Sequence, residues 1–161
     1  MRDTILYGDC LQTLDTLKSH ISIGICDKPR MCVTSPPYYG LRNYGSEDCQ
    51  IGLEESPEEY IQKLVEVFQE VRNNLTDDGT LWLNIGDSYY NYRPGKGQGL
   101  VKQTVSKTKQ DLPDKCSRRG NKLEGLKEKD LIGIPWMLAF ALRADGWYLR
   151  QDIIWHKPNP M

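Results

Sequence analysis

The stretch VTSPPYYG, residues 33–40, joins an apolar run to two consecutive prolines and two tyrosines. A proline has a carbonyl oxygen but no N–H, and each proline disfavours the helical region for the residue before it. The segment Ser35–Pro37 is therefore predicted to be a stiff corner that offers hydrogen-bond acceptors and no donors from its prolines. Tyr38 adds a flat aromatic face beside it. Because Met31–Thr34 is predicted to be a short strand, we expect the corner at a strand end.

Start and stop signals on both sides of this corner predict alternating strands and helices. The clearest helix begins at Ser56, an N-cap that is followed by proline at the first helical position and by Glu59, which completes a capping box. Asp9 is a comparable N-cap for an earlier helix, and Gly146 is a stop for a later one. The predicted strands are 4–7, 31–34, 80–85 and 147–155, and the predicted helices follow Asp9 and cover 56–75 and 135–144. This order predicts an α/β fold with a mostly parallel sheet.

Three polar signatures follow the predicted strands, namely Gly8-Asp9, the corner Ser35–Tyr38 and Gly86-Asp87. Ligands in parallel α/β sheets bind at the carboxyl ends of the strands. The coincidence of the three signatures predicts a binding site at that edge of the sheet. Trp136 and Phe140 stand at helical spacing, so we expect them in the core and not in the site.

The charge of the chain is unevenly distributed, although its formal net charge is only −1. Residues 91–129 contain eleven basic and four acidic residues, a net charge of +7. A stretch of this length without hydrophobic periodicity is predicted to be a flexible insertion. A basic loop on a mildly acidic body favours a polyanionic partner, and a solvated loop without a partner is the alternative. Within it, residues 95–99 have the composition of a cofactor glycine loop, but they follow no apolar strand, so a flexible tip is favoured.

Cysteine and histidine usage argues against a metal site or a disulfide framework. The five cysteines form no CxxC pair, and the chain has two histidines, whereas structural zinc sites need four such ligands at characteristic spacings. No apolar run approaches the roughly 18 residues of a membrane span, and the N-terminus lacks a signal-peptide segment. The composition predicts a cytoplasmic protein with reduced thiols, no metal and no membrane contact.

The corner at Ser35–Pro37 suits a planar ring that carries an exocyclic amino group. The amino hydrogens can be directed at the acceptors while the ring stacks on Tyr38, a contact worth roughly 1–3 kcal/mol per base. Acceptors around the hydrogens favour a localised lone pair on the nitrogen, and they stabilise the positive charge that develops as it attacks an electrophile. A simple turn or a polyproline II ligand is the alternative interpretation of Ser-Pro-Pro alone.

Together these motifs resemble amino-group DNA methyltransferases. The segment Thr34–Gly40 is similar to the [D/N/S]-P-P-[Y/F] catalytic motif of that family, in the branch where it precedes the glycine-rich cofactor motif. Gly8–Cys10 is similar to the family's strand-end acid, Leu81–Asp87 to its next strand motif, and Asp152–Pro158 to the strand that lines the target-base pocket. The matches keep the family's order. The resemblance implies a partial Rossmann-like methyltransferase fold that uses S-adenosylmethionine.

The resemblance also implies a site-specific DNA methyltransferase of a restriction-modification system, which acts on a base flipped out of double-stranded DNA. Serine at the first motif position favours the N4 of cytosine, with the N6 of adenine as the alternative. The implied catalytic residues are Ser35, Pro36, Pro37 and Tyr38, and the implied cofactor-binding residues are Asp9, Cys10 and Thr34. The expected DNA contacts are Tyr39, Arg42, Arg93, Lys96, Arg118, Arg119 and Trp155. RNA is disfavoured as the substrate, because nothing in the chain resembles an RNA-recognition module.

One motif of the family does not occur in the chain. The phenylalanine-glycine cofactor motif should follow a target-recognition region, yet the sequence ends at Met161. We therefore expect residues 1–161 to be the N-terminal, catalytic portion of one methyltransferase domain, with the C-terminal part missing. A C-terminal complementing polypeptide or a homodimer is the expected protein partner. An exposed sheet edge would favour such pairing. The alternative is a non-catalytic DNA-binding or complementing fragment that uses the basic loop and lacks turnover.

Overall fold

The computed structural model of this chain describes residues 4–41, 50–90, 123, 125–156 and 158. Its elements follow the order helix, strand, helix, strand, helix. They are α1 (Cys10–Ser22), β1 (Met31–Thr34), α2 (Pro57–Asn74), β2 (Thr80–Leu83) and α3 (Ile134–Ala144). The prediction of an α/β fold is confirmed, and the three predicted helices all form.

Local capping explains where α1 and α2 begin. The Asp9 carboxylate accepts hydrogen bonds from the N–H groups of Leu11 and Gln12, as expected of an N-cap. The Ser56 hydroxyl accepts from the Glu59 N–H at 3.2 Å. The Glu59 side chain accepts from the Glu55 N–H at 3.2 Å, so the predicted capping box reaches one residue further back than the usual pattern.

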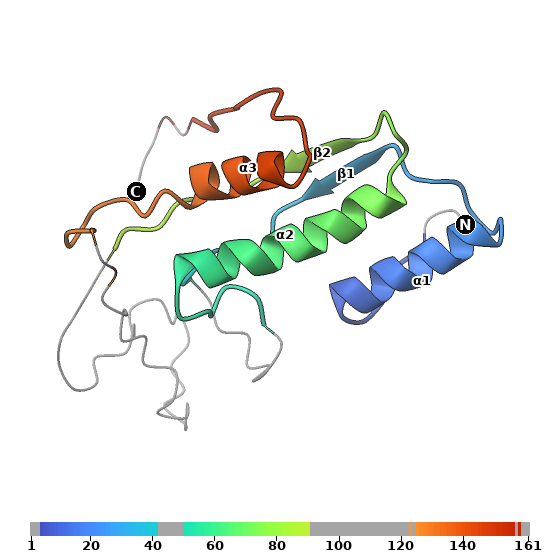
Figure 1. The fold of residues 1–161 in the computed structure, drawn as a ribbon, viewed down its shortest axis with the longest axis horizontal. Helices are drawn as coiled ribbons and strands as arrows, with labels where there is room; N and C mark the ends of the chain where they lie inside the picture. The colour runs from blue at the N-terminus through green and yellow to red at the C-terminus, as the bar shows by residue number, and fades with distance from the viewer. Residues whose placement is uncertain (1–3, 42–49, 91–122, 124, 157, 159–161) are drawn as a thin grey trace, which may run out of the picture.

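The strands β1 and β2 form a parallel pair, with Met31 opposite Thr80 and Val33 opposite Trp82. Helix α2 connects them, as a parallel pair requires. Figure 1 shows all three helices running opposite to the strands, so that each helix begins on the side where the strands end. The predicted parallel arrangement is thus confirmed for this pair.

Helix α2 lies at the centre of the molecule, between α1 and α3 (Figure 1). Its residues Tyr60, Leu64 and Phe68 recur every four positions and form one buried face. Ile134 and Leu138 of α3 complete the fully buried core. Alternate strand residues pack against the same cluster, namely Cys32, Leu81 and Leu83. The helices therefore cover one face of the strand pair.

Two predicted strands do not form in the structure. Residues 4–7 and 147–155 belong to no strand, and Tyr7, Ile154 and Trp155 are 86%, 84% and 78% exposed. A strand is stable only when a neighbouring strand satisfies its backbone groups and a packed layer covers its apolar face. In the described part of the chain no strand pairs with either segment, so their apolar residues alone were not sufficient.

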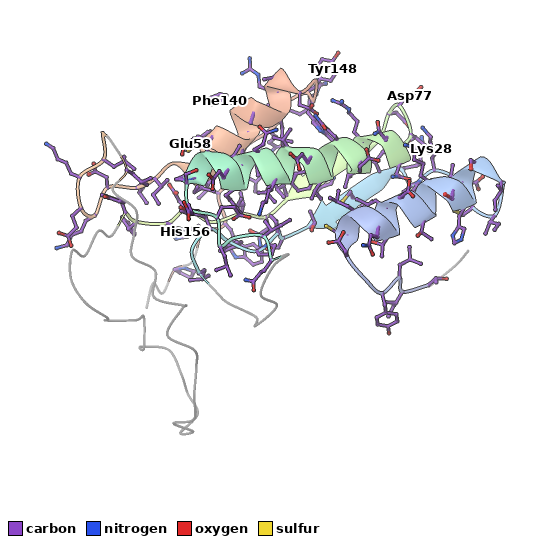
Figure 2. The ribbon with its side chains drawn as sticks, turned by 60° about the horizontal axis from the view of Figure 1, so that its bottom comes forward. Lys28, Glu58, Asp77, Phe140, Tyr148 and His156 are labelled. Atoms are coloured by element: carbon purple, nitrogen blue, oxygen red, sulfur yellow. The ribbon has the colours of Figure 1, made fainter. Side chains whose placement is uncertain are left out.

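The predicted core positions of Trp136 and Phe140 are also wrong. Their side chains are 53% and 56% exposed, and Figure 2 shows Phe140 on the side of α3 that faces away from α2. The buried stripe of α3 is instead Ile134, Leu138 and Leu142. Nearly every residue of this helix is apolar, so hydrophobic spacing could not distinguish its two faces.

Candidate functional site

The corner Ser35–Tyr38 directly follows β1, at the carboxyl end of the strand pair. Ser35 and Pro37 are exposed, and Pro36 and Tyr38 are half-buried. The corner is therefore neither packed inside the core nor on the opposite edge of the strands. Its position agrees with a binding site at the strand ends.

Two of the four carbonyl groups from Thr34 to Pro37 are already hydrogen-bonded. The Thr34 carbonyl accepts from the Asn84 N–H at 2.9 Å, and the Pro37 carbonyl accepts from the Tyr60 hydroxyl at 2.8 Å. Within the residues that the structure describes, the Ser35 hydroxyl and the Pro36 carbonyl have no hydrogen-bond partner. The geometry thus leaves acceptors available at Ser35 and Pro36.

The Tyr38 ring rests on the backbone just beyond β2. A Cβ atom added to Gly86 would lie 3.0 Å from Cε2 of Tyr38. The Tyr38 ring can therefore occupy this position only because residue 86 has no side chain. Gly52 approaches the Tyr38 backbone, since a Cβ atom there would lie 3.0 Å from the Tyr38 carbonyl oxygen. The Gly40 N–H donates to the Gly52 carbonyl at 2.9 Å. Two glycines therefore allow the chain to enclose Tyr38 closely.

Tyr39 is held by a ring contact and by its backbone. Its ring packs against the Tyr60 ring with centroids 5.4 Å apart at 45°, and its carbonyl accepts from the Ser88 hydroxyl at 2.9 Å. The side chain of Tyr39 is half-buried in this position. This contact with Tyr60 could not be read from the hydrophobic spacing around either residue.

Asp87 caps helix α3 across a long sequence separation. Its carboxylate accepts from the N–H groups of Ser88 at 2.9 Å, of Gly133 at 3.0 Å and of Ile134 at 3.0 Å. Gly133 has φ 88° and no side chain to serve as a cap. The polar signature Gly86-Asp87 thus has a structural role that links the end of β2 to α3. No local pattern indicates a cap 46 residues away.

Glu54 anchors the segment that contacts the Tyr38 backbone through Gly52. Its side chain is only 2% exposed and forms an ion pair with Lys63 at 3.2 Å, and it accepts from the Gly52 N–H at 2.8 Å. Burial raises the pKa of the Tyr60 hydroxyl, and the negative charge of Glu54 adds to the shift. With this raised pKa the Tyr60 hydroxyl stays protonated, as a donor, to a higher pH than an ordinary tyrosine.

The predicted cofactor residues Asp9 and Cys10 lie at the start of α1, not at the end of a strand. Figure 1 shows that α1 begins on the same side of the molecule on which β1 and β2 end. Burial raises the pKa of the Cys10 thiol, and the adjacent Asp9 charge raises it further. The described residues show no hydrogen bond between Asp9 or Cys10 and the corner.

The chain at the two ends of the basic segment, residues 91–129, is held together by hydrogen bonds beside the site. The Tyr90 N–H donates to the Asp130 carbonyl at 2.8 Å, and the Lys129 N–H donates to the Tyr90 carbonyl at 2.8 Å. Tyr89 and Leu131 form an antiparallel bridge. The predicted DNA contacts Arg42, Arg93, Lys96, Arg118 and Arg119 lie outside the described residues. Trp155 is described and is 78% exposed.

Neither a membrane-spanning helix nor a metal-binding cluster of side chains occurs in the described part of the chain. No helix there is both long and apolar enough to cross a bilayer. No cluster of three or more His, Cys, Asp or Glu side chains in those same ranges is arranged to hold a metal ion.

Comparison with known proteins links this geometry to a family. A model described as DNA methylase matches residues 30–161. The chain is 48% identical over 158 residues to the Type II methyltransferase M.Cfr9I of Citrobacter freundii, covering 98% of this chain and 47% of that protein. It is 48% identical over 160 residues to the Type II methyltransferase M.SmaI of Serratia marcescens, covering 96% and 48%.

A third relative, the Type II methyltransferase M.SfiI of Streptomyces fimbriatus, is 40% identical over 160 residues, which cover 99% of this chain and 31% of that protein. The chain thus spans about half or less of the length of these relatives. No solved structure matches it. The family model covers most of the chain, including the corner after β1, and on this evidence the chain belongs to the DNA methylase family.

Proposed function

We propose that this chain carries the base-holding part of a site-specific DNA methyltransferase. The observation that supports it most directly is the distribution of acceptors at the corner after β1. The Thr34 and Pro37 carbonyls are occupied by the Asn84 N–H and the Tyr60 hydroxyl. Ser35 and Pro36 are left with acceptors and no competing donor among the described residues. Two neighbouring acceptors match the two hydrogens of an exocyclic amino group.

In this proposal Ser35 and Pro36 accept the two amino hydrogens of a flipped base, and Tyr38 stacks on the base. The Ser35 hydroxyl and the Pro36 carbonyl favour a localised lone pair on the amino nitrogen, and they stabilise the positive charge that develops there. Stacking on Tyr38 offsets part of the few kcal/mol needed to take a base out of the duplex. Pro37 keeps the corner stiff through its fixed φ.

S-adenosylmethionine is the proposed methyl donor, and when bound it supplies the methyl group from its sulfonium. Asp9 fits a ligand with hydroxyl groups, because only its Oδ1 atom is used to cap α1. Its other carboxylate oxygen has no partner among the described residues. Asp9, Cys10 and Thr34 are the residues that we propose to hold the donor. The raised pKa of the Cys10 thiol suits a neutral contact and not a nucleophile.

The proposed target atom is the N4 of cytosine, with the N6 of adenine as the alternative. This preference rests on Ser35, since serine at this motif position is associated with cytosine in the family that the motif resembles. The relatives are named Type II methyltransferases, which supports site-specific methylation within a restriction-modification system.

Double-stranded DNA is the proposed partner of the basic segment. Its flanks meet at Tyr90 and Asp130, and Ser88, two residues earlier, contacts the Tyr39 carbonyl. The residues at both ends of the basic segment thus lie beside the corner that we propose to hold the base. We propose phosphate contacts for Arg93, Lys96, Arg118 and Arg119, and positions near the flipped base for Tyr39, Arg42 and Trp155. Each lost phosphate contact should reduce the slope of log affinity against log salt by about 0.9.

A second candidate function is a DNA-binding or complementing subunit without turnover of its own. It is favoured by the exposed apolar face of the strand pair, with Met31, Val33 and Trp82. In either case we propose that residues 1–161 form part of one methyltransferase domain, completed by a C-terminal polypeptide or by a second copy.

The deciding experiment uses DNA and S-adenosylmethionine with a labelled methyl group. The protein at its natural full length, or this chain with its completing polypeptide, is incubated with both, and the DNA is digested to nucleosides for mass spectrometry. N4-methylcytosine is expected, and N6-methyladenine would replace the proposed base. DNA binding without any labelled nucleoside would support the second candidate.

A pair of tyrosine variants provides the control for this assay. Tyr38→Ala should abolish labelling while the fold is retained. Tyr148→Ala should not affect it, because the Tyr148 side chain is 85% exposed and lies at the periphery, beyond the end of α3 (Figure 2). Full labelling by Tyr38→Ala would contradict the assigned role of Tyr38.

A further inference from the structure

Tyr60 links the buried core to the corner after β1. It lies in the first turn of α2, its residue is 0% exposed, and its hydroxyl donates to the Pro37 carbonyl at 2.8 Å. The two residues are 23 positions apart in the chain. Hydrophobic spacing would assign Tyr60 only a place in the core, next to Ile61 and Leu64.

The position of the Tyr60 hydroxyl is fixed by its surroundings. The ring is part of the same buried cluster as Leu64 and Ile134, and one side of it contacts the Tyr39 ring at 5.4 Å. A buried aromatic ring on a packed helix has little rotamer freedom. A hydrogen bond from such a ring therefore transmits the rigidity of the core to the residue that accepts it.

The bond also determines which acceptors the corner can offer. Without it, the Pro37 carbonyl would be a third acceptor near the Ser35 hydroxyl and the Pro36 carbonyl. With it, and with the Thr34 carbonyl held by the Asn84 N–H at 2.9 Å, the ligand meets acceptors at Ser35 and Pro36. Exocyclic amino groups have two hydrogens, so a third acceptor would allow a second, unproductive orientation of the base.

We propose that Tyr60 is a positioning residue for methyl transfer, which acts by holding the Pro37 carbonyl and thereby orienting the Ser35 and Pro36 acceptors. The proposal rests on the proposed function. Glu54 supports the arrangement through Gly52. Its carboxylate, paired with Lys63 at 3.2 Å, accepts from the Gly52 N–H, and Gly52 in turn lies against the Tyr38 carbonyl oxygen.

The test replaces one hydroxyl group and keeps the ring. Tyr60→Phe removes the donor, and Tyr148→Phe is the matched control, because Tyr148 is 85% exposed. Both are made in the protein at its natural full length and compared by steady-state methylation of DNA. For Tyr60→Phe we expect kcat to fall on the order of tenfold to a hundredfold, with KM for DNA and for S-adenosylmethionine changed less than about threefold.

A lower kcat with a nearly unchanged KM distinguishes a positioning role of Tyr60 from a merely structural one. Loss of folded protein lowers the measured activity through the active fraction, so active sites are first counted by titration with DNA and kcat is expressed per active site. A Tyr60→Phe variant with unchanged kcat per site would overturn the proposal. So would a Ser35→Ala, Tyr60→Phe double variant whose effects are additive, because residues that act on the same acceptor set should be coupled.

A second measurement keeps the hydrogen bond testable if the proposed function fails. The Pro37 carbonyl is labelled with carbon-13, and its infrared band is compared between the parent protein and Tyr60→Phe. Loss of the donor should move the band to higher frequency, and an unmoved band would overturn the inferred contact. If no protein in the series methylates DNA while the band still moves, the proposed function fails and the contact stands.

Discussion

Gly86 is the residue on which the Tyr38 ring rests, and its missing side chain is what allows the contact. A Cβ atom there would lie 3.0 Å from Cε2 of Tyr38 and 3.4 Å from its Cδ2. Gly86 is not among the described glycines with positive φ, so alanine should fit the backbone. We predict that Gly86→Ala displaces the Tyr38 ring and lowers the methylation rate on the order of tenfold, at a cost in stability of about 1 kcal/mol from overpacking.

A double-mutant cycle shows whether the effect passes through the Tyr38 ring. In a Tyr38→Ala background the ring is absent, and Gly86→Ala should then have no further effect on the residual rate or on DNA affinity. Equal losses in both backgrounds would mean that Gly86 acts by another route.

Tyr60 makes a pH-dependent contribution to stability. Burial, with Glu54 nearby, raises its pKa above the ordinary 10.0. The folded state therefore holds this proton more tightly than the unfolded state does. The resulting stability is fully present below a pH of about 10 and is lost as the pH rises through the folded-state pKa. Urea unfolding at about pH 8 and about pH 11 should show a steeper loss for the parent protein than for Tyr60→Phe.

Tyr148→Phe serves as the control for this titration. Because its side chain is 85% exposed, the variant should follow the parent protein at both pH values. Parallel pH profiles for the parent protein and Tyr60→Phe would show that Tyr60 does not carry the alkaline loss of stability.

At the scale of elements, the helices differ in where their caps come from. Helices α1 and α2 are capped by the residues immediately before them, Asp9 and Ser56. Helix α3 has Gly133 before it and is capped by Asp87 from the end of β2. Caps of the first kind were predictable from the sequence, and the cap of α3 was not, because only the folded chain places Asp87 there.

We predict that Asp87→Ala destabilises the protein by roughly 1–2 kcal/mol, because three N–H groups lose their acceptor. Asp87→Asn should cost less, since asparagine is an equally good cap. The measurement is urea unfolding followed by circular dichroism. Asp77→Ala is the matched control, because Asp77 is exposed in the turn after α2 (Figure 2) and should change stability by less than about 0.5 kcal/mol. Equal effects at the two positions would contradict the capping role.

The contrast between local and long-range contacts also explains how much of the site could be predicted. The corner Ser35–Tyr38 was found from its residue types, and the structure places it at the end of β1 as expected. Tyr60 and Glu54, which support the corner, were missed because each depends on a contact between separate elements. Gly86 was part of a predicted signature, but its contact with the Tyr38 ring was not predicted. A tyrosine on the buried face of an amphipathic helix was the one available signal, since a buried hydroxyl needs a partner.

At the scale of the whole molecule, the strand pair has one covered and one open face. Cys32, Leu81 and Leu83 pack against the helices, whereas Met31, Val33 and Trp82 on the opposite face are 57%, 68% and 48% exposed. Parallel strands in proteins are almost always covered on both faces. No strand pairs with the predicted strands 4–7 and 147–155 in the described part of the chain, and strands form only with neighbouring strands. The open face of the strand pair and the absence of these two strands both follow if the sheet is completed by further chain.

This sequence spans 47% of M.Cfr9I and 48% of M.SmaI. We predict that a polypeptide corresponding to their remaining half covers the open face. Hydroxyl-radical footprinting should then show Met31 and Trp82 oxidised readily in this chain alone, and several-fold more slowly when that polypeptide is present. Met137, which packs against the core, is the internal reference and should be oxidised slowly in both samples. Equal oxidation of Met31 and Trp82 with and without the second polypeptide would contradict the prediction, because a covering layer must exclude solvent from both residues at once.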